Sequence, residues 1–285
     1  MNIFSFFRRN LRKKKSYFYI EKDFDLNILN ESLDSCNIFG IDTEFDWRTT
    51  YLPKLSLLQI STPSEIFVID SIKVSVKDVL KKYLEDDLIL KIFHSVRSDT
   101  TILSKCLNCH TKNVFDIQIA EKFISKDNIK SYGKIINKYF GINLKKTETN
   151  SNWLKRPLTE DQIKYAIDDV DYLIETYLIQ RKILKKNKIL DKVFMSSEEE
   201  AFLGNQPLKA LRLKKQKKLS KRDKEIFSWR EDLALKKNIP PSYIFKDKYL
   251  TKLYKLKSKD VSAKEKLMKI IGDSLVVEQF ITKFL

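Results

Sequence analysis

The fold of this chain is decided by the stretch Phe39-Gly40-Ile41-Asp42-Thr43-Glu44-Phe45. Along this stretch Phe39, Ile41, Thr43 and Phe45 alternate with Gly40, Asp42 and Glu44. This period of two predicts a β-strand over residues 36–45. Asp42 and Glu44 are two positions apart, so both carboxylates project from the same face of that strand. Neighbouring carboxylates repel each other and are costly to bury, and a divalent cation would remove that cost. An isolated Asp-x-Glu is more often a solvent-exposed strand end, so other acids must decide between the two interpretations.

The segments on both sides of this strand complete an α/β pattern. Apolar runs at residues 55–60 and 66–70, joined by Ser-Thr-Pro-Ser-Glu, predict a hairpin. Thr159 and Gln162 have the spacing of a capping box and begin a helix whose apolar stripe reaches Tyr177. The remaining predicted elements are strands near residues 17, 88–93 and 114–117, and helices up to residue 33 and over 76–84, 100–107, 120–123 and 131–140. A meander followed by alternating helices and strands predicts a mixed sheet flanked by helices.

The composition sets broad limits. With 285 residues, 42% of them hydrophobic, the chain can form one substantial core and a smaller second one. Only five Gly and six Pro argue against collagen-like and Gly-rich phosphate-loop proteins, and no apolar run is long enough to span a membrane. An odd number of cysteines (three) and the absence of a secretory signal predict a cytoplasmic protein with no membrane partner.

Positive charge is concentrated at the two ends of the chain. The net charge is +17, and residues 209–285 carry 22 Lys and Arg against nine Asp and Glu. Residues 1–16 carry six basic and no acidic residues. Such clustering is typical of proteins that bind a polyanion, although solvated lysine-rich faces would give the same composition.

Further acids support a metal site at the strand. Asp99 follows the predicted strand at 88–93, and Asp169 lies on the capped helix, with Tyr165 one turn before it on the same face. Asp168 is about 100° away around that helix, which places it on the solvent side. Four carboxylates suit two hard cations, which prefer oxygen ligands and can bridge a scissile phosphate.

Three segments together resemble the motifs of the DEDD exonuclease superfamily. The first is the strand segment quoted above, the second is Phe93-His94-Ser95 with Asp99, and the third runs from Tyr165 to Leu173 in the tyrosine form. Connecting segments such as Tyr51-Leu52-Pro53, Phe115-Asp116-Ile117-Gln118 and Trp153-Leu154-Lys155-Arg156-Pro157-Leu158 resemble its ribonuclease D branch. The resemblance covers residues 18–195 and implies a ribonuclease-H-like fold.

The resemblance also implies a reaction and a site. The reaction is 3′→5′ hydrolytic release of nucleoside 5′-monophosphates from RNA such as tRNA precursors. The residues that would bind two Mg²⁺ or Mn²⁺ ions are Asp42, Glu44, Asp99 and Asp169. Tyr165 would orient the attacking water, because a free tyrosine with a pKa of about 10 is a poor base at neutral pH. Residues expected to contact the substrate are Thr43, His94, Trp153 and Arg156; for His94 a purely structural role is an equal alternative.

The basic C-terminal segment resembles a second known module. Three of its segments are similar to the helical HRDC domain shared by ribonuclease D and RecQ-type helicases. They are Phe227-Ser228-Trp229-Arg230-Glu231, Ile239-Pro240-Pro241 and residues 263–272. Trp229 is expected in its core rather than as a platform for base stacking. The expected organisation is a basic N-terminal extension (1–17), an exonuclease domain (18–195), a linker (196–208) and an HRDC-like basic helical domain (209–285).

Several alternatives remain open from the sequence. Cys106-Leu107-Asn108-Cys109-His110 matches a haem c attachment pattern, but without export we expect neither haem nor zinc. The acids do not distinguish ribose from deoxyribose, so the same chemistry could act on DNA. A catalytically inactive nucleic-acid-binding module on the same fold is a further alternative, which the intact acids and Tyr165 argue against. We expect a monomer.

Overall fold

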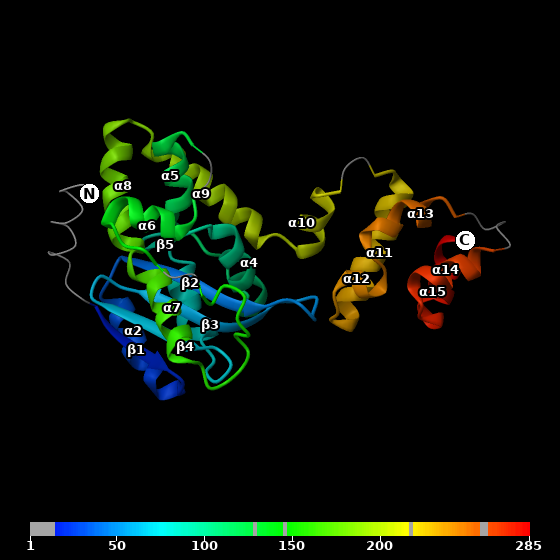
Figure 1. Ribbon diagram of the computed structural model, residues 1–285, viewed down its shortest axis with the longest axis horizontal. Helices are drawn as coiled ribbons and strands as arrows, with labels where there is room; N and C mark the ends of the chain where they lie inside the picture. The colour runs from blue at the N-terminus through cyan, green and yellow to red at the C-terminus, as the bar shows by residue number, and fades with distance from the viewer. Residues whose placement is uncertain (1–14, 128–129, 145–146, 217–218, 257–261) are drawn as a thin grey trace. The chain divides into compact units, whose positions relative to one another are not determined.

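The computed structural model describes residues 15–127, 130–144, 147–216, 219–256 and 262–285 (Figure 1). Most of the expected N-terminal extension, residues 1–14, therefore lies outside the described residues. The chain divides into two compact units, Met1–Asp46 with Lys54–Asn205, and Trp47–Pro53 with Gln206–Leu285. Within the described ranges, no helix combines the length and the apolar character that crossing a membrane requires.

A six-stranded mixed sheet organises the described part of the first unit, in the order β1-β4-β3-β2-β5-β6. The strands β2, β3 and β4 form an antiparallel meander, while β1 pairs parallel to β4, β5 to β2, and β6 to β5. The bounds are β1 (Ser16–Ile20), β2 (Ile38–Asp46), β3 (Lys54–Ser61), β4 (Glu65–Asp70), β5 (Leu90–Phe93) and β6 (Val114–Asp116). The predicted mixed sheet is confirmed, and β2 lies inside it between β3 and β5.

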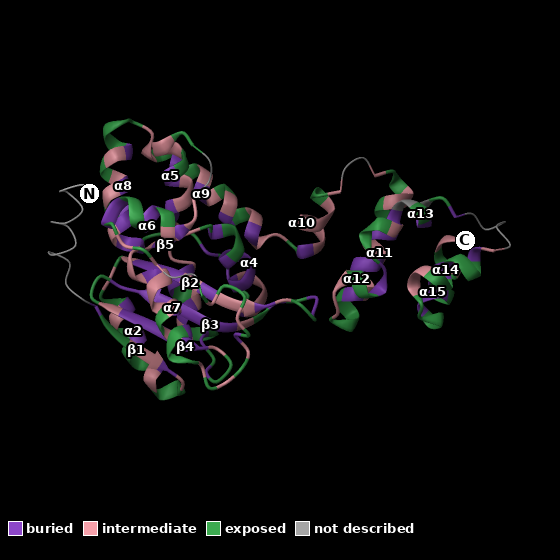
Figure 2. Ribbon diagram, viewed as in Figure 1, coloured by how far each residue is buried: buried purple, intermediate pink, exposed green. Residues whose placement is uncertain are grey.

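Helices cover both faces of this sheet, and β2 and β3 are mostly buried between them (Figure 2). On one face lie α2 (Leu26–Asp34), α3 (Lys77–Leu84) and α4 (Val96–Leu107). On the other lie α5 (Ile117–Ser125), α6 (Tyr132–Phe140), α7 (Glu160–Asp171) and α8 (Leu173–Lys186). Two further elements of this unit are the 3-10 turn η1 (Asp23–Asp25) and α9 (Leu190–Asn205).

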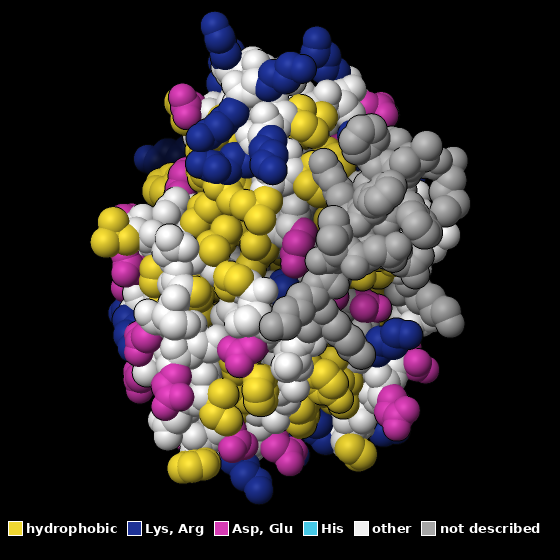
Figure 3. Space-filling model, turned by 90° about the vertical axis from the view of Figure 1, so that its left-hand side faces the viewer, with side chains coloured by type: hydrophobic (Ala, Val, Ile, Leu, Met, Phe, Trp, Pro, Cys, Tyr) yellow, Lys and Arg dark blue, Asp and Glu magenta, His cyan; other side chains and the backbone are white. Residues whose placement is uncertain are grey.

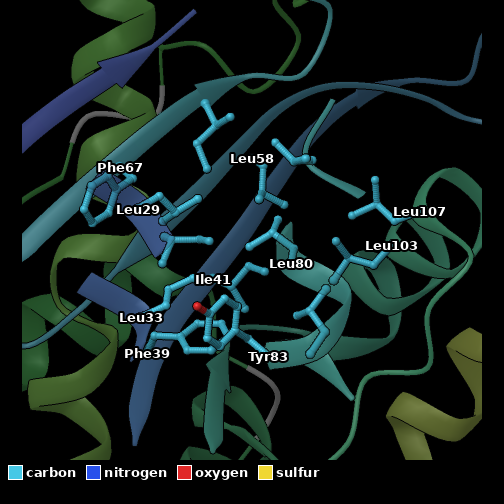
Figure 4. Close-up of a cluster of buried hydrophobic side chains, with 14 of the residues drawn as sticks. Leu29, Leu33, Phe39, Ile41, Leu58, Phe67, Leu80, Tyr83, Leu103 and Leu107 are labelled. Carbon is cyan, nitrogen blue, oxygen red and sulfur yellow. The ribbon is translucent and has the colours of Figure 1, made fainter. Parts of the chain in front are cut away.

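Alternation along β2 separates the two cores. The side chains of Phe39 and Ile41 enter the core beneath α2, α3 and α4, which Figure 4 shows in close-up. Both are fully buried there, and full burial of such a side chain contributes about 1.5–3 kcal/mol. The intervening positions, including Asp42 and Glu44, face the helices of the opposite layer. The pattern read from the sequence therefore directs both acids to one face, as predicted.

The helix boundaries differ from the prediction in three places. The helix that begins with the confirmed Thr159–Gln162 capping box ends at Asp171, and α8 starts after Tyr172. Helix α4 begins at Val96 rather than at residue 100, so Asp99 lies in its first turn. Residues 196–205, expected in a linker, form the second half of α9, where Gly204 lies against Thr100 of α4 and Glu200 pairs with Arg97.

Gly40 permits close packing beside the strand acids. A Cβ atom at this position would lie 2.6 Å from Ser61 Oγ and 2.9 Å from Leu173 Cβ. We therefore expect Gly40→Ala to lower the free energy of unfolding by about 1–3 kcal/mol, because β3 and α8 must move apart. Urea denaturation measures the change. Lys54→Ala, an exposed substitution on β3, serves as the control and should stay within about 0.5 kcal/mol of the wild type.

The second unit is helical. Its described elements are α10 (Leu208–Lys214), α11 (Lys221–Lys237), α12 (Pro241–Ile244), η2 (Asp247–Tyr249), α13 (Leu250–Tyr254), α14 (Ala263–Ile271) and α15 (Ser274–Phe284). Trp229 packs edge-on against Phe280 and Phe284, which places it in the core as expected. Tyr51, from the segment between β2 and β3, belongs to this core, and its hydroxyl donates to buried Glu231 over 3.0 Å.

Candidate metal centre and active site

The predicted acids meet in a pocket of about 290 Å³ in the first unit. Its lining comes from strand β2, the start of α4, the start of α6, the segment before α7, and α7 itself. The four predicted acids and Tyr165 are all among the lining residues. Segments that are far apart in the sequence therefore converge here as the motif order predicted.

Three of the four carboxylates form a tight group. One oxygen from each of Asp42, Glu44 and Asp169 lies within 4.8 Å of the others. Burial and the neighbouring negative charges raise the pKa of Glu44 to about 10, and burial with the charge of Asp99 raises the pKa of Asp42 well above its usual value. Carboxylate oxygens so close together, with no Lys or Arg among the described residues that line the pocket, match the ligand preference of a hard divalent ion. The residues present therefore fit a metal site.

Asp99 lies on the same pocket but outside that group of three. It projects from the first turn of α4, is 4% exposed, and accepts a hydrogen bond of 2.6 Å from the Thr43 hydroxyl. Burial raises the pKa of Asp99 to about 7, and the hydrogen bond from Thr43 opposes that rise. Thr43, which separates Asp42 from Glu44 on the strand, thus ties the second motif to the first.

Asp116 holds the turn that places Asp99. The backbone N–H groups of Ser95 and Val96 donate to its carboxylate over 3.1 and 2.8 Å, and the N–H groups at the start of α5 donate to it as well. Ser95 has a left-handed backbone with φ of 68°. One buried carboxylate thus stabilises the beginnings of both α4 and α5. Its only signal in the sequence is its place in a segment that resembles ribonuclease D.

Tyr165 is held as a neutral phenol beside Asp169. Its ring packs near the indole of Trp153, with centroids 5.9 Å apart, and its hydroxyl lies 3.5 Å from that of Thr149. Burial and the charge of Asp169 raise the pKa of Tyr165 well above its usual value of about 10. Its hydroxyl can therefore orient a water by hydrogen bonding but is a poor base.

Comparison with known proteins agrees with this geometry. Residues 17–186 match the 3′-5′ exonuclease family. The chain belongs to that family. Residues 221–285 match the HRDC domain. Both matches agree with the resemblances read from the sequence.

Individual relatives are similar to most of this chain. Ribonuclease D of Desulfotalea psychrophila is 34% identical, over 79% of this chain and 63% of that protein, and ribonuclease D of Bartonella henselae is 32% identical, over 83% and 60%. The chain thus spans about three fifths of the length of these relatives. The crystal structure of Escherichia coli RNase D, described as an exoribonuclease involved in structured RNA processing, has a TM-score of 0.80 at 22% identity and covers 94% of this chain and 76% of that one.

Two of the residues expected to contact substrate line the pocket that holds the four acids, and two do not. Thr43 and His94 line it; His94 Nε2 lies 3.1 Å from the Gln118 amide nitrogen, and its ring lies edge-on to Tyr132. Trp153 is 3% exposed and packs beside Tyr165. Arg156 makes a two-point ion pair of 2.6 and 2.7 Å with buried Asp70. Its guanidinium is therefore committed to stabilising the Asp70 charge.

Other residues that line the pocket of the four acids were not foreseen. Asp168, placed on the solvent side by the helix geometry, also lines it. The lining further includes Ser98, Tyr132 and Leu144. The sequence holds no local signal for Tyr132, at the start of α6, or for Leu144, in the segment that follows α6, because only tertiary packing brings them to the acids.

Proposed function

We propose that this chain is a metal-dependent 3′→5′ exoribonuclease of the ribonuclease D type, which releases nucleoside 5′-monophosphates from RNA 3′ ends. The observation that carries the proposal is the convergence of Asp42, Glu44 and Asp169 within 4.8 Å in a pocket that Asp99 and Tyr165 also line. An inactive binding module has no need for such a costly group of carboxylates. The names of the curated relatives support the assignment.

The proposed metals are two Mg²⁺ or Mn²⁺ ions. Asp42, Glu44 and Asp169 would hold one, and Asp99, which lines the same pocket outside that group, would contribute to holding the other. When bound, such ions lower the pKa of water and stabilise charge on the leaving oxygen. The protein then has to keep its carboxylates ionised and fixed in place. Thr43 does so for Asp99 through its 2.6 Å hydrogen bond.

Tyr165 would position the attacking water rather than deprotonate it. We expect Tyr165→Phe to lower kcat by about 10- to 100-fold, because only the orienting hydrogen bond is lost. The pH–rate profile should keep its shape, since a phenol whose pKa is raised above its usual value does not titrate near neutral pH. Thr149→Val, which removes the neighbouring hydroxyl, is the control. Loss of a titration step in Tyr165→Phe alone would show that Tyr165 is the base.

An adjoining hollow offers a path for the RNA strand. It measures about 520 Å³, shares Gly133 and Leu144 with the acid pocket, and is lined further by Lys134, Asn137 and Asn143, with no carboxylate among the described residues that line it. A cation and two amides suit a phosphodiester next to the terminal nucleotide. Lys and Arg side chains also gather at the upper end of one face, where α8 lies (Figure 3). We propose structured RNA, such as tRNA precursors, as the substrate.

The basic helical unit would add contacts to the RNA backbone. We expect replacement of Lys246, Lys248 and Lys252 by Gln to flatten the dependence of log K on log salt, by up to about 0.7 for each lysine that contacts a single-strand phosphate. Binding titrations at several salt concentrations measure this slope. These substitutions leave the Tyr51–Glu231 contact intact, whereas deleting residues 209–285 would remove Glu231 from beside Tyr51. Lys22, Lys77 and Lys81 of the first unit form the matched control set. Equal slopes for the wild type and the first variant would contradict the proposed contacts.

The deciding experiment compares end-labelled RNA and DNA oligonucleotides of the same sequence. We expect stepwise shortening of the RNA from its 3′ end with Mg²⁺ or Mn²⁺ and none with a chelator. Faster degradation of the DNA would reassign the substrate. No degradation of either, with metal present, would leave only a binding module.

A further inference from the structure

Gln59 is a buried amide directly beside the metal centre. It lies on β3 in register with Asp42 of β2, so both side chains project from the same face of the sheet. Gln59 is 0% exposed, and neither its Nε2 nor its Oε1 atom has a hydrogen-bond partner among the residues that the structure describes. The next residue on this face, Ser61, donates to Val170 O of α7 over 2.8 Å. Gln59 is thus enclosed between the sheet and the helix layer without a hydrogen bond such as the one that Ser61 makes.

An unpaired buried amide is unfavourable. It costs about 1–3 kcal/mol, which an apolar side chain of similar volume would avoid. Groups of this kind in a folded protein call for an explanation such as a catalytic role or a bound ion. Gln59 is flanked on its own face of the strand by Leu57 and Ser61, both also fully buried, so solvation does not explain its polarity.

Asp42 is placed to supply the missing partner. Its carboxylate can accept several hydrogen bonds, and the one donor assigned to it among the described residues is the backbone N–H of Thr43. Directly opposed residues of an antiparallel pair have Cβ atoms about 4.5–5.5 Å apart, which a glutamine side chain can bridge. A donor without an acceptor therefore lies next to a carboxylate that has one assigned donor and can accept further hydrogen bonds.

We propose that Gln59 is a positioning residue for the metal centre: in the metal-bound protein its Nε2–H would donate to the Asp42 carboxylate and fix the orientation of that ligand. The inference rests on the proposed function, because it requires Asp42 to be a metal ligand. Hydrogen bonds to a ligating carboxylate orient it, and their loss typically weakens metal binding by 10- to 100-fold. The amide is retained despite its cost because Asp42 needs this second donor.

The test separates metal affinity from stability. We expect Gln59→Met to bind Mn²⁺ about 10- to 100-fold more weakly in a calorimetric titration without substrate. Its metal-free form should unfold in urea at the same or a higher concentration than the wild type, since the unpaired amide is gone. The matched control, Ser61→Ala, removes a hydrogen bond on the same face; it should lower stability and leave Mn²⁺ affinity unchanged. Gln59→Leu repeats the test if Gln59→Met does not fold.

The outcomes distinguish the two proposals. Unchanged Mn²⁺ affinity in Gln59→Met or Gln59→Leu, with the wild type binding Mn²⁺, would overturn the role of Gln59 alone. A wild type that binds no Mn²⁺ would overturn both the role of Gln59 and the proposed metal site. In ¹⁵N spectra, a shift of the Gln59 side-chain amide on adding Mg²⁺ supports the hydrogen bond, and the absence of a shift contradicts it.

Discussion

Asp42→Asn and Asp169→Asn are each expected to lose metal-dependent exonuclease activity by a factor of about 10³ or more. Both residues belong to the group of three carboxylates within 4.8 Å, so each substitution removes a charged ligand from the proposed centre. Several kcal/mol of charge stabilisation then disappear, and each 1.4 kcal/mol corresponds to a factor of ten in rate. Single-turnover digestion of end-labelled RNA measures the loss.

The same substitutions should leave the fold intact. Asn has nearly the same shape as Asp, and removing one of several repelling charges relieves the metal-free protein. Urea unfolding with a chelator present should therefore show stability equal to or above that of the wild type. Asp168→Asn is the matched control, because Asp168 lines the same pocket without belonging to the group of three. A smaller loss is expected for it, and wild-type rates in Asp42→Asn would refute the proposed site.

Removing metal should make stability strongly dependent on pH. In the folded protein the pKa of Asp99 is raised to about 7 and that of Glu44 to about 10, whereas unfolded carboxyls titrate near 4. A raised pKa means that folding favours the protonated form. The contribution of these groups is thus fully present below about pH 4 and is lost as pH rises through 7 and toward 10.

We therefore expect the chelated protein to lose about 1.4 kcal/mol per pH unit for each group that is protonated in the folded state and ionised in the unfolded state. Above pH 7, Asp99 no longer contributes to this dependence of stability on pH, whereas Glu44 still does. A divalent cation replaces the proton, so the rise in Tm on adding Mg²⁺ should be larger at pH 9 than at pH 6. Thermal unfolding at both values, with metal and with chelator, measures this. An equal rise at both pH values would show that the carboxylates do not bind the metal.

Local patterns in the sequence were sufficient for much of the architecture. The alternation in Phe39-Gly40-Ile41-Asp42-Thr43-Glu44-Phe45 predicted a strand with both acids on one face, and β2 has that arrangement. The capping box at Thr159 and Gln162 fixed the start of α7, with Tyr165 and Asp169 one turn apart. These features depend on backbone geometry over two to four residues, which neighbouring residues determine.

The partners of individual side chains depended on packing between distant segments. Tertiary structure placed Asp99 outside the group formed by the other three acids. It paired Arg156 with Asp70 in an ion pair. It also continued α9 into the expected linker, as far as Asn205, and enclosed Gln59 beside Asp42. The sequence by itself determined which residues could perform the chemistry, because spacing along one element decides which face a side chain occupies. Only the tertiary structure decided which of them meet, because that depends on how the elements pack against one another.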